Sequence, residues 1–164
     1  MKKYTQLILE SRNNFMDEAI ALAKLSIQRG GGPFGCVIVK DGKIIGRGHN
    51  KVTMNNDPTA HAEITAIREA CRTLNTFQLT GCEIYTSCYP CPMCWASIYW
   101  AKLDKVYYAL NQHDAANAGF DDIFIYQELS KPMDKRKIPF FEIMRDDAKI
   151  IFDDWENKTD KIEY

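Results

Sequence analysis

Apolar residues recur at the spacing of an amphipathic helix between residues 12 and 29. The helix is expected to end at residues 30–33, because this Gly-Gly-Gly-Pro run interrupts helices. β-Branched residues then predict a strand at 34–40, followed by a second strand at 43–49. Asp41-Gly42 between them is typical of a two-residue hairpin turn, since both positions tolerate positive φ angles. The apolar helix face contains Phe15, Ala19, Leu22, Ala23 and Ile27.

Helical and extended patterns alternate through the rest of the chain, after a polar loop at 50–58. Thr59 is a plausible N-cap and Pro92 suits the first position of a helix. The expected elements are a helix from Thr59, a strand at 83–86, a helix from Pro92 through Ala101, a strand at 105–110, a helix at 117–129, an extended segment at 139–145 and a helix at 147–158. This alternation predicts an α/β fold with a mixed sheet, because its first two strands form a hairpin. No repeat or linker interrupts the chain, so residues 1–164 are expected to form one domain.

Composition narrows the classes of partner. The net charge is −1 and the sequence pI is about 6.3, whereas a dedicated nucleic-acid binder usually has a basic stripe. A small-molecule substrate is therefore favoured over nucleic acid. The apolar run at residues 7–9 is too short for a signal peptide, and no stretch approaches the length of a membrane span. We therefore expect a cytoplasmic protein with no membrane partner.

Two short motifs hold the residues with the clearest chemistry, His61-Ala62-Glu63 and Pro90-Cys91-Pro92-Met93-Cys94. Both lie at predicted helix starts. Cys91 at the cap and Cys94 one turn later would direct both sulfurs to one point, and the positive end of the helix favours thiolates. One imidazole and two thiolates give three zinc ligands and leave a fourth position for water, which is the catalytic pattern.

Glu63 is two residues from the predicted ligand His61, so it can reach a zinc-bound water without binding the metal. The order H-x-E followed by P-C-x-x-C is the signature of zinc base deaminases. The alternative is a structural zinc site with Cys88 as a fourth ligand, but that site would leave Glu63 without a role. The sequence therefore predicts a zinc hydrolase with Glu63 as its proton shuttle.

At these motifs the sequence resembles the cytidine deaminase-like superfamily, and more closely the bacterial guanine deaminases. The resemblance runs from about Phe15 to Tyr164. The segments that carry the resemblance are 31–35 (GGPFG), 56–63 (NDPTAHAE), 85–88 (YTSC), 90–94 (PCPMC), 98–101 (IYWA), 118–122 (AGFDD) and the Glu163-Tyr164 end. The last two of these segments distinguish guanine deaminases from their relatives.

The resemblance implies a three-layer α/β/α fold with a central five-stranded sheet and one zinc ion per subunit. It implies hydrolysis of guanine, a small purine base, to xanthine and ammonia. Glu63 and Asp122 would then assist proton transfer. The residues that would contact the base are Asn50, Phe34, Trp100, Tyr164 and Ala62. The family's C-terminal segment, here about 147–164, tends to exchange between two subunits, so a homodimer with Tyr164 over the neighbour's site is expected.

Structural interpretations stand beside several of these roles. Asn50 could serve a turn, Asp121 and Asp122 could cap a helix, and the aromatic residues could be core. The glycines at 30–32 lack the Lys-Ser/Thr of a phosphate loop, and we expect them to let the backbone pass close to the pocket. Tyr89 departs from the glutamate usual in the family. The competing functions are tRNA adenosine deamination, deamination of another nucleobase and a non-catalytic zinc scaffold.

Overall fold

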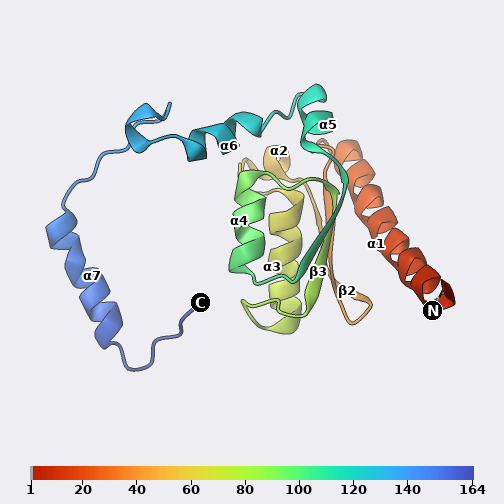
Figure 1. Ribbon diagram of the computed structural model, residues 1–164, viewed down its shortest axis with the longest axis horizontal. Helices are drawn as coiled ribbons and strands as arrows, with labels where there is room; N and C mark the ends of the chain where they lie inside the picture. Colours follow the sequence, from red (N-terminus) through yellow and green to blue (C-terminus); the bar gives the residue numbers. More distant parts are fainter. Residues whose placement is uncertain (1) are drawn as a thin grey trace. The chain divides into compact units, whose positions relative to one another are not determined.

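The computed structural model describes residues 2–164, with side chains from residue 12 onward (Figure 1). The chain forms two compact units, the first up to Ile123 and the second from Phe124 to Tyr164. The first unit opens with helix α1, Lys2–Gln28, which begins well before the predicted start at residue 12. None of the described helices combines the length and the apolar character that crossing a bilayer requires.

The first unit is built on a mixed sheet with the strand order β2-β1-β3-β4. Its strands are β1 (Gly35–Lys40), β2 (Lys43–His49), β3 (Cys82–Cys88) and β4 (Lys105–Leu110). β1 is antiparallel to β2 and β3, whereas β3 and β4 are parallel. The α/β class and the mixed sheet are therefore confirmed. The described residues form four strands rather than the expected five.

The hairpin between β1 and β2 follows the sequence prediction. Asp41 and Gly42 have φ angles of 49° and 72°, as a turn with two left-handed positions requires. Strand residues on either side pair in antiparallel register, with one irregularity between Ile38 and Val39. The turn thus fixes how the long N-terminal segment enters the sheet.

Helices cover both faces of the sheet. On one face α1 contributes Phe15 and Leu22 to a cluster around Val37 and Tyr85. On the other face the sheet packs against α3 (Ala62–Leu74) and α4 (Pro92–Trp100), as Figure 1 shows. The buried residues of this second core are Cys36, Ile38, Ala62, Ala66, Ala70, Leu79, Cys82, Ile84, Ile98 and Ala101. The first unit therefore has the expected three layers.

A glycine in β2 sets the position of α3. A Cβ at Gly48 would collide with the Ala62 carbonyl and lie 2.6 Å from the Ala66 backbone nitrogen. Only glycine lets the start of α3 lie directly on the strand. This close approach places His61 and Glu63, at the start of α3, near the end of β2.

The predicted N-cap of α3 is wrong. Thr59 donates from its backbone nitrogen and its hydroxyl to Asp57 Oδ1, at 2.8 Å and 2.7 Å. Because Thr59 is bonded to Asp57 in this local turn, it does not cap the helix. His61 is the N-cap instead. The preceding loop also contains a short helix, α2 (Val52–Asn55).

The helix predicted at 117–129 begins later, at Ile123, and a short helix that the sequence did not predict precedes it. α5 (Gln112–Asn117) ends before Gly119, whose φ of 89° takes the backbone out of the helical region. The chain resumes helical structure at α6 (Ile123–Ser130). The break leaves the 118–122 segment as a loop at the end of the first unit.

The second unit contains the rest of α6, a 3₁₀ turn at Met133–Lys135 and α7 (Arg145–Asn157). The extended segment predicted at 139–145 forms no strand, because a strand needs the backbone of a neighbour and this segment has none among the described residues. This accounts for the missing fifth strand. None of the residues 124–164 is buried.

Candidate active site

Three ligand atoms converge where α3 and α4 begin. His61 and Cys91 are the N-caps of these two helices, and Cys94 lies in the first turn of α4. Nδ1 of His61 lies 3.5 Å from Sγ of Cys91 and 3.5 Å from Sγ of Cys94. These residues form the one group of three or more potential metal ligands among the described side chains.

The three atoms fit a zinc ion. Bonds of about 2.3 Å to sulfur and about 2.0–2.1 Å to nitrogen at tetrahedral angles separate the ligand atoms by about 3.5 Å. The separations from His61 match this value. Cys88 does not join the group, since its thiol donates to the Asn111 carbonyl at 3.6 Å. Burial raises the pKa of Cys88 to about 11, so it stays a neutral thiol.

Cys91 is prepared to act as a thiolate. Hydrogen bonding from Cys94, assisted by that from His61, lowers the pKa of the Cys91 thiol to about 4. Cys91 and Cys94 lie at the start of α4, where unpaired backbone N–H groups favour negative charge. The favoured ionisation state is the one that binds zinc.

Glu63 lies beside the cluster without belonging to it. One carboxylate oxygen accepts a hydrogen bond from the Thr86 hydroxyl at 3.1 Å, and the other lies 3.4 Å from Cys94 Sγ. Thr86 is buried in β3 and Glu63 is only 5% exposed. Burial raises the pKa of Glu63, which brings this carboxyl closer to the range in which it can both accept and return a proton.

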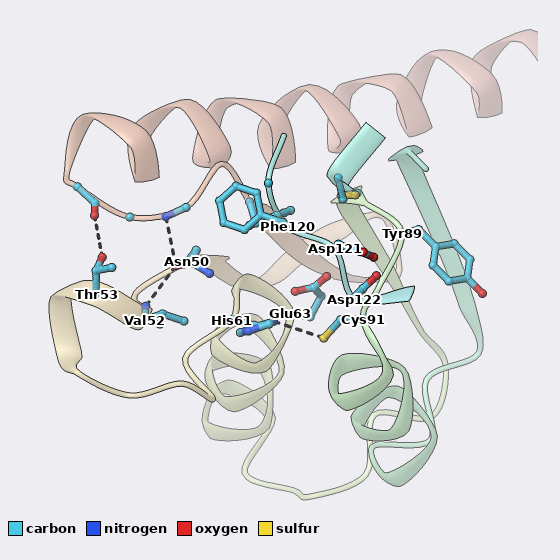
Figure 2. Close-up of a pocket in the computed structure, with 17 residues that line it drawn as sticks. Asn50, Val52, Thr53, His61, Glu63, Tyr89, Cys91, Phe120, Asp121 and Asp122 are labelled. Carbon is cyan, nitrogen blue, oxygen red and sulfur yellow. Dashed lines mark hydrogen bonds between the residues drawn. The ribbon is translucent and has the colours of Figure 1, made fainter. Parts of the chain in front are cut away.

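A cavity of about 540 Å³ opens over Glu63, His61 and Cys91. Figure 2 shows Asn50, Glu63, Cys91 and Asp122 around a common space, with Phe120 beside them. The lining residues are Gly30, Gly31, Gly32, Phe34, Asn50, Val52, Thr53, His61, Glu63, Cys88, Tyr89, Cys91, Ala115, Gly119, Phe120, Asp121 and Asp122. A cavity of this volume is large enough for a small planar molecule.

The cavity has one apolar wall and, in addition to Glu63, two acidic residues, Asp121 and Asp122. The rings of Phe34 and Phe120 meet edge to face, with centroids 5.0 Å apart. Asp122 has a buried oxygen, Oδ1, with no hydrogen-bond partner among the described residues. Burial and the nearby Cys91 charge raise the pKa of Asp122. Asp122 also lines the cavity, which places its carboxyl group within reach of a bound molecule.

The structure brings most of the predicted site residues together. Phe34, Asn50, Glu63 and Asp122 all line the cavity around the metal ligands. Ala62 is fully buried in the core between His61 and Glu63. The glycines at 30–32 also line the cavity, as expected for a backbone that passes close to the pocket.

Like Ala62, two further predicted residues are not part of the cavity lining. Trp100, at the end of α4, is 65% exposed and does not line the cavity. Tyr164 ends the second unit and is also exposed. Their predicted contacts with a base therefore depend on surfaces that this cavity does not include.

Sequence reasoning missed two contributors. Thr86 holds Glu63 across 23 positions of sequence, and such pairing depends on where β3 lies against α3. Phe120 was noticed only as part of the 118–122 segment, although an aromatic residue beside an aspartate pair could have suggested a wall. Tyr89 does line the cavity, but Figure 2 shows its ring pointing away toward β4, where it packs edge to face on Tyr108 at 5.1 Å.

Comparisons with known proteins agree with this geometry. Residues 9–110 match the family model described as the cytidine and deoxycytidylate deaminase zinc-binding region. Guanine deaminase of Bacillus subtilis is 52% identical over 155 residues, which cover 94% of this chain and 99% of that protein. Its crystal structure superposes with a TM-score of 0.90 over 93% of this chain and 98% of the other.

A second group of relatives shares only part of the chain. The tRNA-specific adenosine deaminase of Aquifex aeolicus is 45% identical over 95 residues, which cover 58% of this chain and 63% of that protein. The similarity to the B. subtilis protein thus extends over a longer stretch than the similarity to the tRNA enzyme.

Proposed function

The chain belongs to the guanine deaminases of the zinc-dependent cytidine and deoxycytidylate deaminase family, and we propose how its residues divide the work of that reaction. The reaction is the hydrolysis of guanine to xanthine and ammonia. The observation that carries this function is the position of the Glu63 carboxylate, 3.4 Å from a ligand sulfur and facing a cavity with room for a base. His61, Cys91 and Cys94 are the residues that would hold the zinc ion.

When bound, zinc supplies a Lewis acid that makes water a nucleophile near neutral pH. Glu63 takes the proton that this water gives up and delivers it to the base, then helps the exocyclic amine to leave. The Thr86 hydroxyl supports this role, because it donates a hydrogen bond to one carboxylate oxygen of Glu63. The other carboxylate oxygen then faces Cys94 and the other metal ligands. Burial around Glu63 keeps bulk water from competing for the proton.

The remaining cavity residues hold the base in place. Asn50 donates hydrogen bonds to it, and Asp122 contacts its ring edge and assists proton transfer. The place of Asp122 in the cavity lining supports this assignment. Phe34 and Phe120 provide an apolar wall against which a planar ring can lie. Ala62 serves the site by continuing the backbone between His61 and Glu63.

Residues 1–164 act as one deaminase domain whose C-terminal segment, about 147–164, exchanges between the subunits of a homodimer. Residues 124–164, which include this segment, contain no buried residue and cannot form a core alone, and their many exposed apolar side chains favour burial against a second copy. The large ones are Phe124, Ile125, Leu129, Met133, Ile138, Phe140, Phe141, Ile143, Met144, Ile150, Ile151, Phe152, Trp155, Ile162 and Tyr164. Trp100 and Tyr164 then contact the base at a site shared by both subunits.

The protein works in the cytoplasm, in purine catabolism. All six cysteines are free thiols, and two of them must remain reduced to hold zinc. A reducing compartment preserves them.

Ammonia release by the purified zinc-loaded protein tests the reaction. Guanine, adenine, cytosine, guanosine and tRNA are offered in parallel, and release is expected from guanine alone. Glu63→Gln should abolish it. If inosine formed in tRNA and no ammonia were released from guanine, the protein would be a tRNA adenosine deaminase and the proposal of guanine deamination would be wrong.

Hybrid dimers test the exchanged segment. Glu63→Gln and Tyr164→Ala subunits are co-expressed with different tags, and the hybrid is purified by both tags. If Tyr164 completes the neighbour's site, each hybrid contains one intact site and its activity exceeds that of either parent. Activity no higher than the average of the parents would refute the exchange.

A further inference from the structure

The backbone carbonyl of Asn50 accepts two side-chain hydrogen bonds. The Ser26 hydroxyl donates to it at 2.9 Å, and His49 Nδ1 lies 3.1 Å from it. Because a carbonyl oxygen only accepts, His49 must carry its proton on Nδ1. The two bonds use both lone pairs of the carbonyl. Ser26 and His49 are both buried, and neither lines the cavity.

The glycine-rich loop closes around the same carbonyl. Gly31 donates from its backbone nitrogen to the Ser26 carbonyl at 2.8 Å. A Cβ on Gly31 would lie 2.6 Å from the Ser26 hydroxyl oxygen and would collide with the Asn50 carbonyl. Only glycine therefore permits this contact, and the helix end, the loop and the end of β2 are held against one another.

The Asn50 side chain is fixed in one orientation. Its Oδ1 accepts hydrogen bonds from the backbone nitrogens of Gly32 at 3.3 Å and Val52 at 3.2 Å, both drawn in Figure 2. Both partners are donors, so oxygen must face them and a flipped amide is excluded. The Asn50 backbone nitrogen donates to Phe34. Within the described residues only Nδ2 lacks a partner, so Asn50 offers the cavity donors and no acceptor.

We propose that Ser26 and His49 are positioning residues that act through the Asn50 carbonyl, so that Asn50 selects bases by their hydrogen-bond acceptors. The inference rests on the proposed function for the identity of the base. Guanine carries acceptors at its 6-oxo group and at N7. A base that lacks the acceptor met by Nδ2 leaves a desolvated donor unpaired, a mismatch that a polar site rejects strongly. Ser26 and His49 thus influence base selectivity without touching the base.

Binding and turnover are both measured with guanine, 2-aminopurine, which lacks the 6-oxo group, and 7-deazaguanine, which lacks N7. The variants are Ser26→Ala, His49→Leu and His49→Asn. Asparagine can place an amide nitrogen near the position of Nδ1, so His49→Asn is the conservative rescue. Ser97→Ala is the matched control, because the Ser97 hydroxyl also donates to a backbone carbonyl at 2.9 Å and Ser97 does not line the cavity.

The wild-type protein is expected to bind guanine at least about tenfold more tightly than one of the two analogues. Ser26→Ala and His49→Leu should each weaken guanine binding about threefold to tenfold, as expected for a lost hydrogen bond. They should leave binding of the disfavoured analogue nearly unchanged, so that selectivity falls. His49→Asn and Ser97→Ala should retain the wild-type selectivity. If Ser26 or His49 had a purely structural role, its loss would weaken the binding of all three bases by the same factor. That result would overturn the inference.

Asn50→Asp provides a second measurement that does not depend on Ser26 or His49. Aspartate can still accept from Gly32 and Val52 but presents an acceptor to the base instead of donors. Guanine binding should fall about a hundredfold or more. Guanine binding within about threefold of wild type would overturn the donor assignment. If the wild-type protein releases no ammonia from guanine, the proposed function fails. The selectivity in binding then decides the inference alone.

Discussion

The two ends of the cavity are built differently. At the metal end His61, Cys91 and Cys94 come from the first turns of two helices packed on the sheet. At the other end, where we propose that the base binds, Asn50, Phe120 and Asp122 come from loops held by hydrogen bonds to backbone atoms and by ring contacts. Helices on a core give fixed ligand geometry, whereas loops tolerate change and carry specificity.

The comparison also separates shared chemistry from substrate choice. The zinc motifs lie within residues 9–110, which match the family model, but Phe120 and Asp122 lie beyond them. The B. subtilis guanine deaminase aligns over 155 residues and the A. aeolicus tRNA enzyme over only 95. Changes at the metal end should therefore abolish the reaction, while changes at the base end should alter which base reacts and how tightly.

Loss of a metal ligand should have the largest effect. Cys91→Ala removes one of three protein ligands, so zinc content and ammonia release should both fall to background. Elemental analysis of the purified variant, with activity measured on the same sample, checks this. Cys88→Ala is the matched control and should retain zinc, because Cys88 bonds to Asn111 instead. A full zinc complement in Cys91→Ala would contradict the assigned ligands.

Glu63→Gln should separate metal binding from proton transfer. Glutamine can still accept the Thr86 hydrogen bond but cannot take a proton, so kcat should fall about 10²–10⁴-fold. Zinc content should stay at the wild-type level. Steady-state kinetics together with metal analysis measure both quantities. If the variant turned over guanine at a near-normal rate, Glu63 could not be the proton shuttle.

Sequence predicted the metal end better than the base end for a physical reason. Pro92 and the Cys91–Cys94 spacing encode their geometry within one helical turn, and Cys91 is indeed the N-cap. By contrast, Thr86 donates a hydrogen bond to Glu63, and Ser26 donates one to Asn50. In each pair the two residues are more than 20 positions apart in the sequence. Such contacts depend on how α1, α3 and the sheet pack, which periodicity does not reveal.

The errors in the fold prediction have a similar origin. The sequence predicted Thr59 as the N-cap of α3, but Thr59 donates its hydrogen bonds to Asp57 instead. The helix therefore begins after His61. The apolar segment at 139–145 is compatible with a strand, but strand formation requires a partner edge that the described chain does not provide. Local pattern therefore identified most elements, while tertiary pairing determined their limits and the number of strands.

Asp122→Asn should have an intermediate effect, because we propose that Asp122 both contacts the base and assists proton transfer. The amide keeps the size of the side chain but offers the cavity no negative charge. We expect kcat/KM for guanine to fall about tenfold to a hundredfold, in line with loss of one charge-assisted hydrogen bond. The neighbouring Asp121→Asn change is the control and should have little effect, since Asp121 Oδ1 accepts from the Ile123 backbone. Equal losses in both variants would argue against a specific role for Asp122.

Phe120→Leu should have the smallest effect of these changes and should act on binding alone. The substitution removes the edge-to-face contact with Phe34, an interaction whose free energy is about 0.5–1.5 kcal/mol, but retains apolar bulk. KM for guanine should rise about threefold to tenfold, while kcat stays within about twofold of wild type. Phe77→Leu, at an exposed residue that does not line the cavity, should change neither constant. A fall in kcat comparable to that of Asp122→Asn would show that the loop at 118–122 aligns the base for reaction, and the division between a chemical end and a binding end would then fail at this loop.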